Sequence, residues 1–365
     1  MFTFLLLALL ANLVLIIFVV YVDKDVVRNN QSTRIVSSQD PKHIVSFRYN
    51  PNALELLWQA NYLDWTQNPC FHIGDERTKI ALQETIDAEE LLFRLVAKVI
   101  YPREDGAPFQ QAKKSEYIQV FEESLESFSS IVTTFSDGST HTSYLEPLIG
   151  TLRDPRHICY DFDKSFHFGF VPSRLHDGLM FPYFVLDPRE WDASRLVDGR
   201  PSAILFDLGA STYSDQGNIL AKLYSALGLE FSHIYAWEVK NVTPQYWEGM
   251  PLNFLKNTHF FNFPVSADIE SPRSALRLLQ EVARPDDYVV FKLDIDTPEV
   301  EIPIINEIIA RPDLASLIDV LFFEHHVDYP EMRRIWGSGL SQTLADSYTL
   351  FRKLRELGIR AHSYP

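Results

Sequence analysis

The fold that we expect of this chain depends on the stretch AILFDLGAS at residues 203–211. Its apolar run lacks the alternation of a half-exposed strand, which is typical of a strand buried on both faces of a parallel sheet. Gly209 allows a tight turn and leaves room for a ligand. Ser214 and Asp215 can cap a following helix, which Gly228 ends. Strand, glycine turn and helix together predict the first half of a nucleotide-binding βαβ unit.

Strand and helix patterns alternate along the chain after this stretch. We expect further strands at residues 233–240, 260–265, 288–296, 320–323 and 359–364. We expect helices at residues 272–283, from about Glu299 onward, and at residues 342–357. This alternation predicts an α/β fold with a doubly wound, mostly parallel, Rossmann-like sheet.

Polar and charged residues gather where the predicted strands end. They are Asp207, Gly209, Ser211, Glu238, Asp294, Asp296, Glu324 and His325. Ligands of such sheets bind at the carboxyl ends of the strands. Carboxylates at buried strand ends need a metal, a base partner or a substrate, because desolvating them is costly. His325 and His326 should point to opposite faces of their strand, so we expect at most one of them to be catalytic.

The residues at these strand ends resemble the motifs of class I S-adenosylmethionine-dependent methyltransferases. FDLGAS at 206–211 resembles the first motif of that superfamily, and Glu238 resembles the acid that ends its second strand. FKLDID at 291–296, followed by Glu299 and Glu301, is similar to the fourth-strand motif of FkbM-type methyltransferases, Lys-x-Asp-x-Glu-Gly-x-Glu. Three differences are a single glycine in the first motif, a Thr-Pro pair at 297–298 in place of Glu-Gly, and a chain that ends where the superfamily usually adds an antiparallel seventh strand.

The resemblance implies S-adenosylmethionine as the cofactor, bound by Asp207, Gly209, Ser211, Glu238 and Asp294. It also implies methyl transfer to a hydroxyl group of a small molecule or glycan, which needs positioning and deprotonation of the acceptor.

Two arrangements would deprotonate that acceptor. In the first, Asp296, Glu324 and His325 surround Mg²⁺. The carboxylates that we expect to coordinate this ion are Asp294, Asp296 and Glu324. Alternatively, His325 is the general base without a metal.

Two other readings of the same residues remain open. Asp294-Ile295-Asp296 is an Asp-x-Asp sequence, which in single-pass glycosyltransferases holds Mn²⁺ on a nucleotide-sugar. A non-catalytic scaffold with a methyltransferase fold is the third reading.

The amino terminus has the pattern of a membrane segment. Residues 2–22 are almost wholly apolar and long enough to span a bilayer, and no basic residue precedes them. We therefore expect an anchor at 1–24, a stem at 25–42 and a single-pass protein of the endomembrane system (endoplasmic reticulum or Golgi). The sequons at Asn30 and Asn241 would matter only in a lumen, so the orientation of the protein in the membrane stays open. Whether Cys70 pairs with Cys159 also stays open.

The stretch between the stem and the sheet has helical periodicity. We expect a helical module at 43–143, with helices near 53–60, 81–99 and 116–131 and a loop at 137–139. The Rossmann-like domain then spans 144–365 and opens with a short helix at 145–155. The 365-residue chain has a formal net charge of -16, so we expect no nucleic-acid partner.

Overall fold

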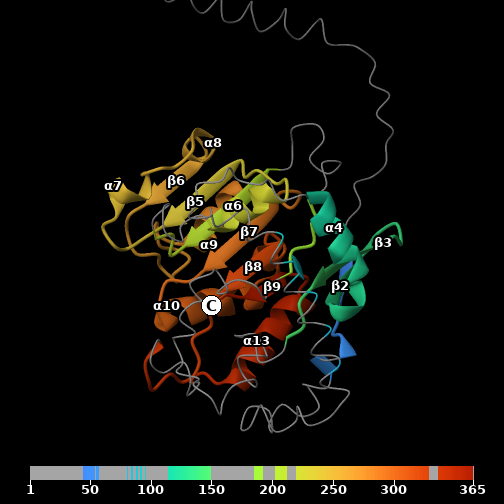
Figure 1. Ribbon diagram of the computed structural model, residues 1–365. Helices are drawn as coiled ribbons and strands as arrows, with labels where there is room; N and C mark the ends of the chain where they lie inside the picture. Colours follow the sequence, from blue (N-terminus) through green and yellow to red (C-terminus); the bar gives the residue numbers. More distant parts are fainter. Residues whose placement is uncertain are drawn as a thin grey trace, which may run out of the picture. The chain divides into compact units, whose positions relative to one another are not determined.

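The computed structural model describes most of the chain from residue 44 onward (Figure 1). The described ranges are 44–53, 55–56, 114–148, 185–191, 202–211, 219–328 and 336–364, with helical residues at 80, 84, 88, 91, 92 and 95. The predicted anchor, stem, Asn30, both cysteines and the helix cap at 214–215 lie outside them. Within the described ranges, no helix combines the length and hydropathy needed to cross a membrane.

A six-stranded sheet forms the centre of the fold. Its strands are β4 (Ala203–Leu208), β5 (His233–Trp237), β6 (Thr258–Phe261), β7 (Tyr288–Leu293), β8 (Val320–Phe323) and β9 (Arg360–Ser363). They pair in the order β6-β5-β4-β7-β8-β9, and every pair is parallel. The α/β, Rossmann-like prediction is thus confirmed, and the sheet is entirely parallel. Because β9 pairs directly with β8, no antiparallel strand separates the two.

Alternate residues of each central strand enter two different apolar cores, as expected of a doubly wound sheet. Ile204, Phe206 and Leu208 of β4 belong to one core, whereas Ala203 and Leu205 belong to the other. The helices are α6 (Ile219–Ala226), α7 (Thr243–Tyr246), α8 (Leu252–Leu255), α9 (Ala275–Val282), α10 (Pro298–Ala310), α11 (Pro312–Ala315) and α13 (Leu344–Glu356). Residues of α9, α10 and α13 fill the first core, and α6 contributes to the second.

The predicted helical module at 43–143 is wrong in part. The region contains a three-stranded antiparallel sheet of β1 (Ile44–Asn50), β2 (Ser129–Phe135) and β3 (Thr140–Leu145). The helix predicted at 116–131 is α4 (Lys114–Glu123), which a 3₁₀ turn at 125–127 follows. Residues from Ser129 onward instead pair with two neighbouring strands, which override the helical spacing. The loop predicted at 137–139 is confirmed as the turn between β2 and β3.

Several predicted element boundaries also move. The chain leaves β5 at Glu238 and β7 at Asp294, so both strands end before the predicted residues. The strand predicted at 260–265 is Thr258–Phe261, because its pairing with β5 runs out opposite Trp237. The helix predicted to begin at Leu145 is not found over 145–148, since Leu145 pairs with Ser129 as the last residue of β3.

Candidate functional site

The turn after β4 is tight because another strand end lies against it. Gly209 has a φ of +86°, and a Cβ at this position would lie 1.6 Å from the main-chain oxygen of Asp294. The N–H groups of Gly209 and Ala210 both donate to the Trp237 carbonyl at the end of β5, at 3.0 and 2.9 Å. The space that sequence reasoning assigned to a ligand at Gly209 is therefore filled by backbone of the β7 end.

Glu238 joins the loops that follow β4 and β5. Its buried carboxylate accepts hydrogen bonds from the N–H of Ser211 at 3.0 Å and of Lys240 at 2.7 Å. Ser211 adopts a φ of +53°, a left-handed conformation that is costly for a residue with a side chain. Each carboxylate oxygen of Glu238 still has a lone pair for a further donor. Two predicted cofactor-binding residues, Ser211 and Glu238, are thus in direct contact.

Asp207 and Asp294 lie on either side of a buried ammonium group. The Nζ of Lys292, on β7, is 3.2 Å from a carboxylate oxygen of each and donates to the Gly209 carbonyl at 2.9 Å. Burial alone would lower the pKa of Lys292, but the charges of Asp294 and Asp207 outweigh it and raise the pKa above its usual value. The structure therefore gives these two predicted cofactor ligands a charged partner in the protein, which sequence reasoning missed.

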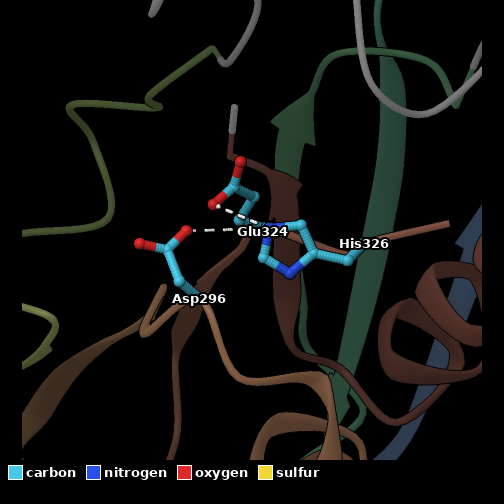
Figure 2. A group of neighbouring side chains, drawn as sticks. All are labelled: Asp296, Glu324 and His326. Carbon is cyan, nitrogen blue, oxygen red and sulfur yellow. Dashed lines mark ion pairs between the residues drawn. The ribbon is translucent and has the colours of Figure 1, made fainter. Parts of the chain in front are cut away.

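Three potential metal ligands converge where β7 and β8 end: Asp296, Glu324 and His326 (Figure 2). The Nε2 atom of His326 is 3.4 Å from Glu324 Oε2 and 3.9 Å from Asp296 Oδ1. One ligand atom from each side chain can be chosen so that all three lie within 4.8 Å of one another. The Asp296 side chain is 79% exposed, whereas those of Glu324 and His326 are 11% and 5% exposed. The cluster is thus buried on one side and open to solvent at Asp296.

The structure brings His326, and not the predicted His325, to the carboxylates of the site. The two rings do differ in orientation, as predicted, but His326 is the one that faces the carboxylates. His325 is fully buried and stacks on Phe323, and neither of its ring nitrogens has a hydrogen-bond partner in the described part of the chain. Burial, together with the charge of His326, lowers the pKa of His325 to about 4. His325 therefore packs in the core as a neutral ring, whereas the carboxylates of the site lie beside His326.

The predicted metal set Asp294, Asp296 and Glu324 also changes. Asp294 interacts with Lys292 and lies outside the group of convergent ligands, where His326 takes its place. Burial, with the charge of Asp294 adding to it, raises the pKa of Glu324, although His326 opposes the shift.

Two further residues of the cluster were not predicted as site residues. Glu301, in the first turn of α10, is buried, and its Oε2 lies 3.3 Å from Nδ1 of His326. Its other oxygen accepts the N–H of Ile295 at 2.9 Å. Trp336 donates its indole N–H to Glu324 Oε1 at 2.9 Å and meets the His326 ring edge to face. The fourth-strand motif already contained Glu301, whereas no sequence signal pointed to Trp336.

The carboxylates around His326 determine its charge. Burial alone would lower its pKa, but hydrogen bonds to Glu301 and Glu324 and their negative charges raise it to about 10. In the described residues, His326 is the only cationic partner of Asp296, Glu301 and Glu324. The site can therefore hold a positive charge, whether a proton on the imidazole or a metal ion.

The carboxyl edge of the sheet thus carries two adjoining groups of polar residues. Ser211 and Glu238 form one, and the Asp296 cluster forms the other, with Gly209 packed on Asp294 between them. Comparisons of the chain with protein-family models, curated proteins and solved structures found no match.

Proposed function

We propose that this protein is an S-adenosylmethionine-dependent methyltransferase that methylates a hydroxyl group of a small molecule or glycan. The observation that carries the proposal is the position of Glu238 at the carboxyl end of β5, next to the glycine turn of β4. In nucleotide-binding sheets, an acid at this place accepts hydrogen bonds from ribose hydroxyls. Glu238 fits this role, because each of its oxygens accepts only one backbone N–H and can accept another donor.

The cluster at β7 and β8 supports the choice of a hydroxyl acceptor. In the transfer, the acceptor oxygen forms a bond to the methyl carbon as the carbon–sulfur bond breaks, and the hydroxyl proton must leave. Asp296 and Glu324 lie at this edge of the sheet, where their carboxylates can accept that proton or hold a metal ion that lowers the pKa of the hydroxyl. Gly209, packed on Asp294, connects this cluster to the loop that carries Ser211.

The proposal includes a place in the cell. Residues 2–22 have the composition of a bilayer-spanning segment, and we propose that they anchor the protein as a single-pass protein of the endomembrane system. Full-length protein in detergent is accordingly the sample for binding experiments.

The test is calorimetric titration of the full-length chain with S-adenosylhomocysteine. We expect one equivalent to bind, and Glu238→Gln to weaken the affinity by about tenfold or more, because a charged acceptor is lost. Glu248→Gln removes the same charge from an exposed position in the same region and should leave the affinity unchanged. A folded wild-type protein that does not bind, or a Glu238→Gln variant that binds equally well, would overturn the proposal.

The glycosyltransferase alternative has less support from the geometry. Its metal would need Asp294 and Asp296 together, but Asp294 pairs with Lys292 and Asp296 faces His326. Binding of a nucleotide-sugar with Mn²⁺, lost in Asp296→Asn, would favour that alternative. A folded protein that binds neither ligand would favour the scaffold.

A further inference from the structure

We propose that Asp296, Glu324 and His326 bind a divalent late first-row transition-metal ion such as Zn²⁺ or Co²⁺, and that Glu301 positions the imidazole ligand. The metal site itself does not depend on methyl transfer.

The spacing of the three ligands suits a single ion. Two donors that each lie about 2 Å from a tetrahedral zinc ion are about 3.3 Å apart. The separation of His326 Nε2 from Glu324 Oε2 is 3.4 Å, and its separation from Asp296 Oδ1 is 3.9 Å. Figure 2 shows both carboxylates facing the same ring nitrogen. The exposed Asp296 side chain can rotate to close the longer gap, so binding requires little movement of the buried ligands.

The groups behind His326 have the arrangement found around metal-bound imidazoles. Such a ring usually donates its second N–H to a carboxylate, which fixes the ring orientation and makes the bound nitrogen a better ligand. Glu301 is placed for this role, with Oε2 3.3 Å from Nδ1, and the Ile295 N–H holds its other oxygen at 2.9 Å. The indole of Trp336 fixes one oxygen of Glu324 and leaves Oε2 toward His326.

The charges around the site also favour a cation. Asp296, Glu301 and Glu324 form no ion pair with a lysine or arginine in the described residues, and Lys292 is already shared by Asp207 and Asp294. Three carboxylates therefore surround one imidazole. Two of the three, Glu301 and Glu324, are buried, and buried carboxylates are usually paired with a cation or coordinate a metal ion.

The imidazole ligand determines which cation we expect. Mg²⁺ prefers an octahedral shell of oxygen atoms, whereas imidazole suits Zn²⁺ and other late first-row ions. Two carboxylates and one imidazole also leave at least one coordination position for a water molecule or a substrate oxygen. If the proposed methyl transfer holds, the acceptor hydroxyl would occupy that position, where a metal lowers its pKa. That role, unlike metal binding, rests on the proposed function.

The test is titration of metal-free, full-length protein with Co²⁺, whose visible absorption reports its coordination. We expect one equivalent to produce ligand-field bands, Zn²⁺ to displace it, and Mg²⁺ to bind at least about 100-fold more weakly. Asp296→Asn should weaken Co²⁺ binding about tenfold or more. Because Asp296 is exposed, the substitution leaves no cavity and the variant should fold. His326→Gln should weaken binding further.

Two glutamates of the same helix provide the matched comparison. Glu301→Gln should weaken Co²⁺ binding by about 10- to 100-fold and shift the absorption bands, because the ring loses its orienting carboxylate. Glu299→Gln, an exposed position two residues away, should change neither. Absence of Co²⁺ bands in folded wild type, unchanged affinity in Asp296→Asn, or preference for Mg²⁺ would each overturn the proposal. Titration with S-adenosylhomocysteine in the presence of a chelator tests the cofactor site without the metal. Binding there, together with absent Co²⁺ bands, would show that only the metal proposal fails.

Discussion

At the scale of single residues, the ends of β4 and β7 are held together by contacts that tolerate little change. Gly209 lies against the Asp294 carbonyl, and Lys292 connects the carboxylates of Asp207 and Asp294. These contacts position the loops of the candidate site. A substitution of Gly209 tests the backbone packing, and a substitution of Lys292 tests the charges.

Gly209→Ala should destabilise the protein much more than a matched glycine substitution. Both Gly209 and Gly249 have positive φ angles, of +86° and +72°, so alanine at either position costs about 1 kcal/mol of backbone strain. Only at Gly209 would the new Cβ collide with backbone, which adds about 3 kcal/mol or more. Urea unfolding measures both variants, and equal losses of stability would contradict the close approach of Asp294.

Lys292→Met should leave the buried carboxylate of Asp207 and the partly buried one of Asp294 without their cation, at a cost of about 3–5 kcal/mol in unfolding free energy. Adding Asp207→Asn and Asp294→Asn to this variant should recover part of the loss, since the unpaired charges are gone. Lys256→Met, at an exposed lysine, is the control and should change stability by less than about 0.5 kcal/mol. A triple variant less stable than Lys292→Met would show that the carboxylates are not the cause.

The sequence predicted that these polar residues gather where the strands of the sheet end, as the structure shows, but it did not resolve their contacts. Strand periodicity predicted that His325 and His326 point to opposite faces, but it does not say which face is apolar beyond the end of β8. Packing of α10 decides this, because it brings Glu301 to His326. Contacts between residues far apart in sequence, such as Trp336 with Glu324, carry no local signal.

At the scale of elements, strands buried on both faces were the most predictable. The runs at β4, β7 and β8 are wholly apolar or nearly so, and all three strands are buried along their length. In contrast, β2 and β3 are rich in serine and threonine, and their pairing is decided by partners as distant as β1. Local spacing therefore extended the α4 helix into what is a strand.

The ion pairs of Glu190 with one residue of β3 and one of β9 should make stability depend on pH. Glu190 lies 2.8 Å from His141 of β3 and 3.1 Å from Arg360 of β9. Burial opposes ionisation, but Arg360 and His141 lower the Glu190 pKa from 4.5 to about 2. The unfolded chain therefore binds this proton at a higher pH than the folded chain. The resulting stability is fully present above about pH 4.5 and is lost as the pH falls toward 2.

Glu190→Gln should remove this part of the pH dependence. Between pH 6 and 3, the unfolding free energy of the variant should fall less steeply than that of wild type, by at most about 3 kcal/mol in total. Urea titrations at each pH measure the difference. Glu122→Gln, on the exposed face of α4, should keep the wild-type slope. Parallel curves for wild type and Glu190→Gln would contradict the ion pairs.

At the scale of the whole molecule, a buried arginine ties the small antiparallel sheet to the large parallel one. Arg355 of α13 donates to the Tyr49 hydroxyl at 2.8 Å and to the Ala361 carbonyl, and it pairs with Glu146 at 2.9 Å. Figure 1 shows α13 beside β9 and near the strands of the small sheet. Glu146 also contacts His362 at 2.8 Å, so one polar network spans both sheets.

Arg355→Met should destabilise the protein by about 3–5 kcal/mol and reduce the cooperativity of unfolding, because Glu146 stays buried without its cation. Arg352→Met, one turn earlier on α13, removes an exposed pair with Glu356 and a contact with Tyr348, and it should cost less than about 1 kcal/mol. Calorimetry provides the transition temperature and the ratio of calorimetric to van't Hoff enthalpy. Equal effects of the two substitutions would contradict the role of this network.

Hydrogen exchange of the full-length chain with and without S-adenosylhomocysteine tests the proposed cofactor site most directly. The account predicts slower exchange in peptides that contain residues 207–211 and 237–242, where Glu238 joins the two loops. Peptides of β2 and β3 should exchange equally with and without the ligand. Unchanged exchange at 207–211 and 237–242 under saturating ligand, or protection confined to another part of the chain, would contradict the account.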